Sequence, residues 1–380
     1  MTAKHLFMAA CCATLLFSCA EDDVTPQYEG VKIENEKPDA GGNMRGFYVL
    51  NEGNMGQNKC TLDYYDYLTC TYARNVYAQA NPNVVLELGD VGNDIAVHGD
   101  KLYIVVNGSH KVEVCNALTA ERIGQVNINS PRYIAFDDNG NAYVSSFVGG
   151  NGDNGSVVRF NTENLTVTGT VSVGLQPEEL VVDGDKLYVA NSGQFQAPDY
   201  DTTISVVDLN SMSVEYKIEA GVNMHHLRMD PYNNLYVTTR GNYADIPSQI
   251  MRFTKQADGK YAADATIDAP CANIAYGDGY FRFYGTTWDA NWQATYNFNS
   301  IAPLENGYTF YPESFLSAAG QAEIQTPYAI AVNPCTGDII VTDAKNYVSS
   351  GELFYFDKNG NLRWHTTTGD IPGHIAFVAK

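Results

Sequence analysis

The sequence predicts an all-β fold, a seven-bladed β-propeller, and three observations support this prediction. A stretch made of a short apolar strand, an Asp/Asn/Gly turn and a second strand recurs, with copies that begin at residues 92, 131, 177, 224, 271, 327 and 372. These starts are 39, 46, 47, 47, 56 and 45 residues apart, a period typical of blades built from four short strands. Strand-forming residues are also abundant, with 26 Tyr, and no long segment shows the 3.6-residue periodicity of a helix.

The N-terminus is predicted to be a targeting signal rather than part of the fold. Residues 1–18 combine a basic start at Lys4 with an apolar run that is too short to span a membrane as a stable helix, which is typical of a signal peptide. The four residues Leu16-Phe17-Ser18-Cys19 resemble a bacterial lipobox, although Phe17 is larger than usual at its position. This resemblance implies cleavage before Cys19 and attachment of lipid to it.

Residues 19–45 are expected to form a lipidated, flexible, acidic tether. Glu21, Asp22 and Asp23 follow the cysteine after Ala20, and the stretch is polar, contains two prolines and lacks periodicity. An acidic cluster at this place resembles the surface-export signal of Bacteroidetes lipoproteins. It implies a lipid-anchored protein on the extracellular face of the outer membrane; a plain solvated linker is the alternative.

Residues 46–380 are expected to form the propeller, as a single domain. In the copy at residue 131, strands are expected at 133–136, 142–147, 156–160 and 166–173. The Asp-rich sequences DDNGN, DPYNN and DKNGN fall between paired strands, so they are interpreted as hairpin turns rather than calcium loops, which would need a Glu at the twelfth position.

The two ends of the propeller are expected to complete one blade together. The last copy, Pro372 to Lys380, is an inner strand with no partners after it, whereas the first piece, from Gly46, begins with a second strand and has no inner one. Pairing of Ile375 to Val378 with Phe47 to Leu50 would close the ring and remove its open edges.

Charge and cysteine content exclude several classes of function. The net charge is −21 without a basic patch, which argues against nucleic acid binding and against charge-driven adhesion to an anionic membrane; the lipid anchor is the expected membrane contact. Five cysteines remain after Cys19, scattered over different blades, with no Cys-x-x-Cys or Cys/His cluster. We therefore expect buried free thiols and no metal centre.

Two sets of residues are expected to meet at one end of the central channel. The first is the residue before the aligned apolar position of each inner strand; the set is Asp94, Tyr133, Glu179, His226, Asn273, Ala329 and His374. The second comes from the long loops between the second and third strands of the blades; it includes Asn54, Asn107, Phe147, Phe195, Arg240, Tyr243, Trp288, Trp292 and Tyr347. Channel residues are often merely solvated, but aromatic residues in such loops indicate a surface for a large flat ligand with amides or hydroxyls.

The sequence favours binding over catalysis. No Gly-x-Ser-x-Gly elbow and no Ser/His/Asp order is present. His225 and His226 are neighbours on a strand, so their rings are expected on opposite sides, unable to hold one ion together. A lactonase-type propeller with a central metal on Glu179, Asn273 and Asp94 is the enzymatic alternative.

The run Phe47 to Gly56, FYVLNEGNMG, followed by Asp63-Tyr64-Tyr65-Asp66, resembles the opening of the YncE-like surface propeller lipoproteins of Bacteroidetes. That family includes the cobalamin-capturing BtuG proteins, which cap a TonB-dependent corrinoid transporter. The resemblance implies a non-enzymatic protein that binds cobalamin or another corrinoid as transported ligand, without a cofactor of its own, and passes it to such a transporter.

The roles of individual residues follow from geometry, since the resemblance carries no residue-level motif. Stacking on the ligand is expected from Trp288, Trp292, Phe195 and Tyr243. Hydrogen bonds to its rim are expected from Asn54, Asn107, Asn273 and Arg240. If any residue is the axial partner of cobalt, it would be His226. Tyr133, Phe147, Tyr347 and His374 complete the predicted site. A surface glycan-binding propeller is the main alternative, because sugars also favour aromatics with amides, and a scaffold without a small ligand is the third.

Overall fold

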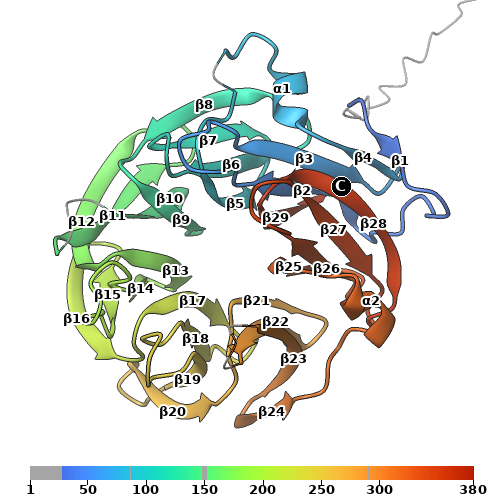
Figure 1. Ribbon diagram of the computed structural model, residues 1–380. Coiled ribbons are helices and arrows are strands. Elements are labelled where there is room, and N and C mark those ends of the chain that lie inside the picture. The colour runs from blue at the N-terminus through green and yellow to red at the C-terminus, as the bar shows by residue number, and fades with distance from the viewer. Residues whose placement is uncertain (1–27, 86, 148–151, 290, 292) are drawn as a thin grey trace, which may run out of the picture.

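The protein is a seven-bladed β-propeller, as the sequence predicts (Figure 1). The computed structural model describes residues 28–380 except 86, 148–151, 290 and 292. In this part of the chain, seven antiparallel sheets surround a central channel. In six of them the first strand in the sequence is innermost, and in the blade built from both termini the last strand of the chain is innermost. No helix in the described ranges is long and apolar enough to cross a membrane.

In six blades the strands follow one another in sequence order from the channel outward. The first blade is built from both termini and contains, from the channel outward, β29 (Pro372–Ala379), β2 (Met44–Asn51), β3 (Thr61–Asp66), β4 (Thr71–Ala73) and β1 (Val31–Lys32). The second contains β5 (Gly92–His98), β6 (Lys101–Val106), β7 (Lys111–Asn116) and β8 (Arg122–Asn127). The third contains β9 (Pro131–Phe136), β10 (Asn141–Ser146), β11 (Asn154–Asn161) and β12 (Val167–Leu175). The fourth contains β13 (Pro177–Asp183), β14 (Lys186–Asn191), β15 (Thr203–Asp208) and β16 (Ser213–Glu219).

The remaining three blades repeat this order. The fifth contains β17 (Met224–Met229), β18 (Leu235–Thr239), β19 (Gln249–Lys255) and β20 (Tyr261–Ile267). The sixth contains β21 (Asn273–Gly277), β22 (Tyr280–Trp288), β23 (Ala294–Leu304) and β24 (Gly307–Tyr311). The seventh contains β25 (Pro327–Val332), β26 (Ile339–Asp343), β27 (Ser350–Phe356) and β28 (Leu362–Asp370). Two short helices, α1 (Val76–Ala80) and α2 (Ala318–Ala322), lie in connections between blades, and α2 accounts for part of the longest repeat spacing.

The repeat in the sequence marks the inner strands. Six of the seven predicted copy starts coincide with the first residue of an inner strand, and the seventh, Cys271, lies two residues before β21. The copies therefore place equivalent side chains at equivalent heights along the channel.

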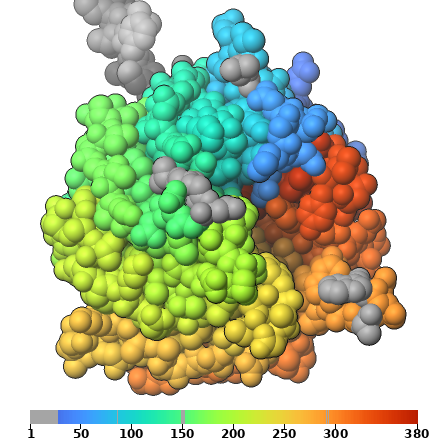
Figure 2. All heavy atoms as spheres, turned by 60° about the vertical axis from the view of Figure 1, so that its left-hand side comes forward, coloured from blue at the N-terminus to red at the C-terminus, as the bar shows by residue number. Residues whose placement is uncertain are grey.

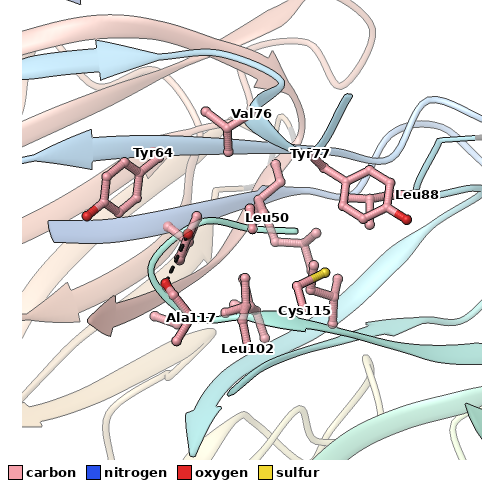
Figure 3. Close-up of a cluster of buried hydrophobic side chains, with 14 of the residues drawn as sticks. Leu50, Tyr64, Val76, Tyr77, Leu88, Leu102, Cys115 and Ala117 are labelled. Atoms are coloured by element: carbon pink, nitrogen blue, oxygen red, sulfur yellow. Dashed lines mark hydrogen bonds between the residues drawn. The ribbon is translucent and has the colours of Figure 1, made fainter. Parts of the chain in front are cut away.

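Apolar side chains fill the space between neighbouring blades. Among the described residues, seven buried clusters join the seven pairs of adjacent blades. Figure 3 shows the cluster between the first and second blades, in which Leu50 and Tyr64 face Leu102 and Cys115. Figure 2 shows the blades as successive sectors around the molecule. Because a sheet buries both of its faces in this way, strand residues of both parities are apolar.

Closure joins the two ends of the chain in the predicted register. Strand β29 pairs antiparallel with β2, with Phe377 opposite Phe47, Ala376 opposite Tyr48 and Ile375 opposite Val49. The blue N-terminal and red C-terminal strands accordingly lie side by side in Figure 1. This confirms the predicted pairing.

The propeller begins earlier in the chain than residue 46. Within the predicted tether, 19–45, the described part from Tyr28 onward lies on the first blade: β1 pairs with β4, and the ring of Tyr28 meets Tyr64 edge-on at 6.0 Å. Ile33 is buried, and Arg45 forms a buried ion pair with Asp66 at 3.0 Å. Signal residues 1–18, Cys19 and the acidic cluster lie outside the described residues.

The Asp-rich sequences are hairpin turns, as predicted. The Asp137 carboxylate accepts the backbone N–H groups of Asn139 and Asn141, both at 2.9 Å, and the side-chain amide of Asn141. Asp230 and Asp357 make the same bonds in their turns. These carboxylates are therefore used by their own turns.

The thiols are free in the described part of the chain. Cys60, Cys70, Cys115 and Cys271 are buried, which agrees with the prediction, whereas Cys335 is exposed on a turn. Burial raises the pKa of the Cys70 thiol above its ordinary value. The four buried cysteines pack as small apolar side chains.

Deleting Pro372–Lys380 should unfold or aggregate the protein. The deletion removes the ladder between β29 and β2, in which each hydrogen bond contributes about 0.5–1.5 kcal/mol net, and it exposes apolar residues on both sides. Total stabilities are roughly 5–15 kcal/mol, so this loss is a large share. Size-exclusion chromatography and thermal melting measure the effect, with removal of the exposed Lys380 alone as control. A truncated monomer with an unchanged melting temperature would contradict the role of closure.

Candidate functional site

The inner strands bring the predicted ring together at the channel. All seven of its residues line one cavity of ≈ 260 Å³: Asp94, Tyr133, Glu179, His226, Asn273, Ala329 and His374. Each comes from a different blade at the same repeat position. The channel is therefore lined by polar side chains in a packed ring.

In six blades a second residue of the inner strand also reaches the site, because the strand pairing there is interrupted by a bulge or register shift; β21 of the sixth blade pairs regularly. In the third, fourth, fifth and seventh blades, two residues of the inner strand face one residue of its neighbour, and the second and first blades show similar shifts. A bulge bends the strand and turns a side chain to a new direction. The residues two before the aligned apolar position thereby line the channel mouth in five blades; they are Asn93, Arg132, His225, Tyr328 and Gly373. Ala272 lines the mouth from the position directly before β21.

A hydroxyl group supports the bulge in three blades. The backbone N–H of His226 donates to Thr238 Oγ1 at 3.0 Å, that of Tyr133 to Ser145 Oγ at 3.1 Å, and that of Ala329 to Thr342 Oγ1 at 2.8 Å. These N–H groups have lost their ladder partners to the bulge and are buried, so a hydroxyl replaces the missing carbonyl.

The expectation that His225 and His226 face opposite sides is wrong. Their ring centroids are 3.7 Å apart, because the bulge in β17 places both on the channel side. A hydrogen bond of 2.8 Å joins Nε2 of His225 to the hydroxyl of Tyr133, and Nδ1 of His226 lies 3.1 Å from Glu179 Oε2. Burial and the charge of Arg240 hold the pKa of His225 well below its usual value, so this imidazole is neutral.

The mouth of the channel is a wide concavity made of two adjoining cavities. The inner one, of ≈ 600 Å³, extends from the ring outward, and the outer one, of ≈ 850 Å³, lies over the fifth and sixth blades. The two share His225, Arg240 and Trp288 among their walls. Cavities of this size are typical of small-molecule sites.

Aromatic rings form one wall of the inner cavity. Tyr284, Trp288 and Tyr296 come from the sixth blade, and Tyr328 and Tyr347 from the seventh. Trp288 is 60 % exposed, and Tyr347 meets Tyr328 edge-on at 5.7 Å. This wall offers flat apolar faces to a ligand.

Charged residues also lie at the inner cavity, and they are paired with one another or hydrogen-bonded. The carboxylate of Glu178, fully buried, accepts from Arg132 Nη2 at 3.0 Å and from Arg240 Nη1 at 3.2 Å. Elsewhere on the wall, Glu52 accepts from the hydroxyl of Tyr328 at 3.0 Å and lies 3.5 Å from Nε2 of His374.

The charges of the channel below are also paired. Burial alone raises the pKa of Glu179, but Arg228 and the hydrogen bond from His226 outweigh it and lower that pKa to about 2. Because the ionised carboxylate only accepts, Nδ1 of neutral His226 donates to it. Burial raises the pKa of Asp94 to about 6, against the lowering effect of His374.

Seven of the predicted site residues line the inner cavity together. They are Tyr133, His226, Arg240, Asn273, Trp288, Tyr347 and His374. Tyr243, 75 % exposed, lines the outer cavity instead. Trp292 lies outside the described residues.

Four predicted residues do not line either cavity. The Asn54 amide donates to the Tyr347 carbonyl at 2.7 Å, and the Asn107 amide to the Pro131 carbonyl at 2.9 Å, so both hold loops in place. Phe147 packs edge-on against Phe195 at 5.9 Å, and Phe195 is largely exposed. Their place in the loops is as expected, but they do not reach the cavity walls.

The sequence prediction missed Glu52, Arg132, His225, Tyr284 and Tyr328 as cavity residues. Three of these residues directly precede a residue of the predicted ring, so the aligned repeat contains the information needed to find them. A listing of the position two before the aligned apolar residue would have found Arg132, His225 and Tyr328.

The side chains of the predicted lactonase-type metal site are held by other partners. Arg228 occupies the carboxylate of Glu179, the Asn273 amide donates to the Tyr328 carbonyl at 3.2 Å, and Asp94 accepts the backbone N–H groups of Ile95 and Ile134. Within the described ranges, no group of three or more His, Cys, Asp or Glu side chains is arranged to hold a metal ion.

Residues 45–368 match a protein family described as "Domain of unknown function (DUF5074)". The match covers most of the propeller, from the start of β2 to the end of the last complete blade. No curated protein matches the chain.

Solved structures with the same architecture are distant in sequence. A quinoprotein alcohol dehydrogenase-like protein from Bacteroides thetaiotaomicron is 14% identical, with 88% of this chain and 78% of the other covered and a TM-score of 0.61. A presumed 6-phosphogluconolactonase from Bacteroides fragilis is 12% identical, covering 90% and 100%, with a TM-score of 0.59. Hydrazine synthase from Kuenenia stuttgartiensis is 17% identical, covering 75% and 89%, with a TM-score of 0.59. Similarity at this level shows the fold alone.

Replacing Thr238 by Val should destabilise the protein through the bulge at the site. The change keeps the side-chain shape and leaves the buried N–H of His226 without an acceptor, a loss of about 1–3 kcal/mol. Urea unfolding measures it. Thr170→Val, on the exposed face of β12, is the matched control and should change little. Equal midpoints for the two variants would show that the hydroxyl does not support the bulge.

Proposed function

We propose that this chain, which belongs to the family described as domain of unknown function DUF5074, is a surface-exposed lipoprotein that binds a corrinoid such as cobalamin at the channel mouth. It would pass the corrinoid to a TonB-dependent transporter of the outer membrane. The ligand is cargo, and the protein performs no chemistry on it.

The observation that carries the proposal is the shape and lining of the mouth. Two adjoining cavities of ≈ 600 and ≈ 850 Å³ share the Trp288 wall, so together they can accept a ligand wider than either. The aromatic wall lies beside polar groups on the same concave surface, among them Asn93, Asn273 and Arg240.

Corrin chemistry suits such a surface. A corrin presents broad apolar faces, which stack on aromatic rings, and a rim of amides, which need donors and acceptors in fixed places. Trp288 and Tyr243 are exposed and line the outer cavity, so they are placed to stack. Asn273 is placed for the rim.

His226 is unsuited to be the axial partner that the sequence suggested. Its Nε2 is buried without a partner, its Nδ1 is bonded to Glu179, and the ring of His225 covers it at 3.7 Å. Cobalt could not reach this nitrogen without movement of both rings. Binding is therefore proposed to rest on stacking and rim hydrogen bonds.

Wild-type protein should bind cyanocobalamin, and Trp288→Ala should weaken binding by about thirtyfold, the cost of roughly 2 kcal/mol expected for a central aromatic anchor. Isothermal titration calorimetry and the visible spectrum of the corrinoid measure this. The matched control is Tyr232→Ala, which removes an exposed aromatic ring from the turn between β17 and β18, at the opposite end of the blade.

Three results would count against this function. Equal losses in the two variants would place the ligand elsewhere. Absence of heat and spectral change in wild-type protein would exclude cobalamin, and binding of an oligosaccharide in its place, weakened by Trp288→Ala, would establish the glycan alternative.

The proposed lipidation and surface location are tested separately. Cys19→Ala should abolish lipidation and membrane association, since it removes the thiol that would carry lipid. Replacing Glu21, Asp22 and Asp23 by Ala should preserve lipidation and remove surface exposure, measured by protease accessibility on intact cells. Unchanged accessibility after the triple replacement would show that the acidic cluster is only a linker.

A further inference from the structure

We infer that Arg132 and Arg240 form an oxyanion subsite in the mouth, which holds an anionic group of the ligand. The inference rests on the proposed ligand-binding function and adds the chemistry of one part of the ligand. It starts from the arrangement of three charged side chains at the junction of the third, fourth and fifth blades.

The two arginines share one carboxylate. Glu178 is fully buried beneath them, with Oε2 accepting from Arg132 Nε and Nη2 and Oε1 from Arg240 Nη1. Both arginine side chains remain partly exposed, at 18% and 20%, and both line the inner cavity. Within this trio, two cations share one anion, which leaves an excess of one positive charge. Glu52, which also lines the cavity, accepts from Tyr328 and lies near His374.

Arg132 is fixed in place before any ligand arrives. Its Nη1 donates to Asn93 Oδ1, whose own amide donates back to the Arg132 carbonyl at 2.6 Å. Its guanidinium lies 4.7 Å from the ring centre of Phe147. A cation held in this way loses little conformational freedom on binding, which favours affinity.

Arg240 is placed to contact the ligand directly. It lines both the inner and the outer cavity, and the bond that it makes to Glu178 uses Nη1 alone. Nε and Nη2 have no partner among the hydrogen bonds of the described residues. The neighbouring His225 is neutral and is bonded to Tyr133, so it adds no competing charge.

A planar guanidinium fork matches the paired oxygens of a phosphate or a carboxylate. Under the proposed function, the anionic group is the phosphate diester that links the nucleotide of cobalamin to the corrin. A carboxylate of an acidic sugar presents the same oxygens and is the other source of this chemistry. The two sources can be separated by choice of ligand.

The test compares cyanocobalamin with dicyanocobinamide, a corrinoid that lacks the nucleotide and its phosphate. Arg240→Gln should weaken cyanocobalamin binding by about tenfold, the loss of one charge-assisted hydrogen bond, and cobinamide binding by less than about twofold. Calorimetry on the full-length protein measures both.

The chain offers a closely matched control. Glu113, also fully buried, is shared by Lys111 at 2.6 Å and Arg122 at 2.5 Å on the outer strands of the second blade. Arg122→Gln therefore removes the same charge and the same kind of ion pair far from the mouth, and should leave both affinities unchanged.

Each other outcome has a defined meaning. Equal losses for both corrinoids in Arg240→Gln would overturn the subsite while leaving the proposed function intact. If wild-type protein binds neither corrinoid, the proposed function fails, and titration with inorganic phosphate and with galacturonate decides the subsite. Binding of either anion that Arg240→Gln abolishes supports the subsite and identifies its source; binding of neither overturns it.

Discussion

The pairing of β29 with β2 is the interaction on which the rest of this structure depends. It joins segments more than 300 residues apart in sequence, so its loop-closure entropy is large and is offset only when all seven blades have docked. Once formed, it removes the two free edges of the blade array. It also brings His374, near the end of the chain, beside Glu52, near its beginning. The complete ring, and thus the cavity at its mouth, exists only in the closed molecule.

Closure alone gives a channel, and the bulges bring additional side chains to its mouth. A regular strand would direct alternate residues to the two neighbouring blades, leaving few side chains for the mouth. The bulge at the start of each of these inner strands frees an additional residue, and in three blades a buried Ser or Thr hydroxyl satisfies the N–H group that the bulge leaves unpaired. The pairing of His225 with His226, and of Arg132 with Tyr133, follows from this local irregularity in the ladder.

The fold and the channel ring could be predicted because both are encoded in the repeat. The shared position in the aligned repeat places Asp94, Tyr133 and His226 at one height without any knowledge of their contacts. The bulges could not be predicted, since a strand with one extra residue has the same composition as a regular one, and so Arg132 and His225 were missed. Loops have no period, which is why Asn54 and Asn107 were placed in the site although their amides are used by backbone carbonyls nearby. The tether boundary was misplaced because Tyr28 to Arg45 is polar on average and is ordered by a few contacts, among them Ile33 and the Arg45–Asp66 pair.

The whole chain is negatively charged, whereas the arginine pair at the site is positively charged. A net charge of −21 repels anions at long range, but at physiological salt this field is screened within about 8 Å. Inside the mouth, Glu178 offsets one of the two charges of Arg132 and Arg240, and the remaining positive charge acts at shorter range than the acidic surface on a group in direct contact. The acidic surface therefore does not increase the association rate of an anionic ligand, but it need not weaken the affinity of one that is bound at the site. Selection at this mouth would depend on short-range fit to the aromatic wall and the guanidinium pair, and a large, mostly neutral ligand with a single anionic group satisfies both conditions.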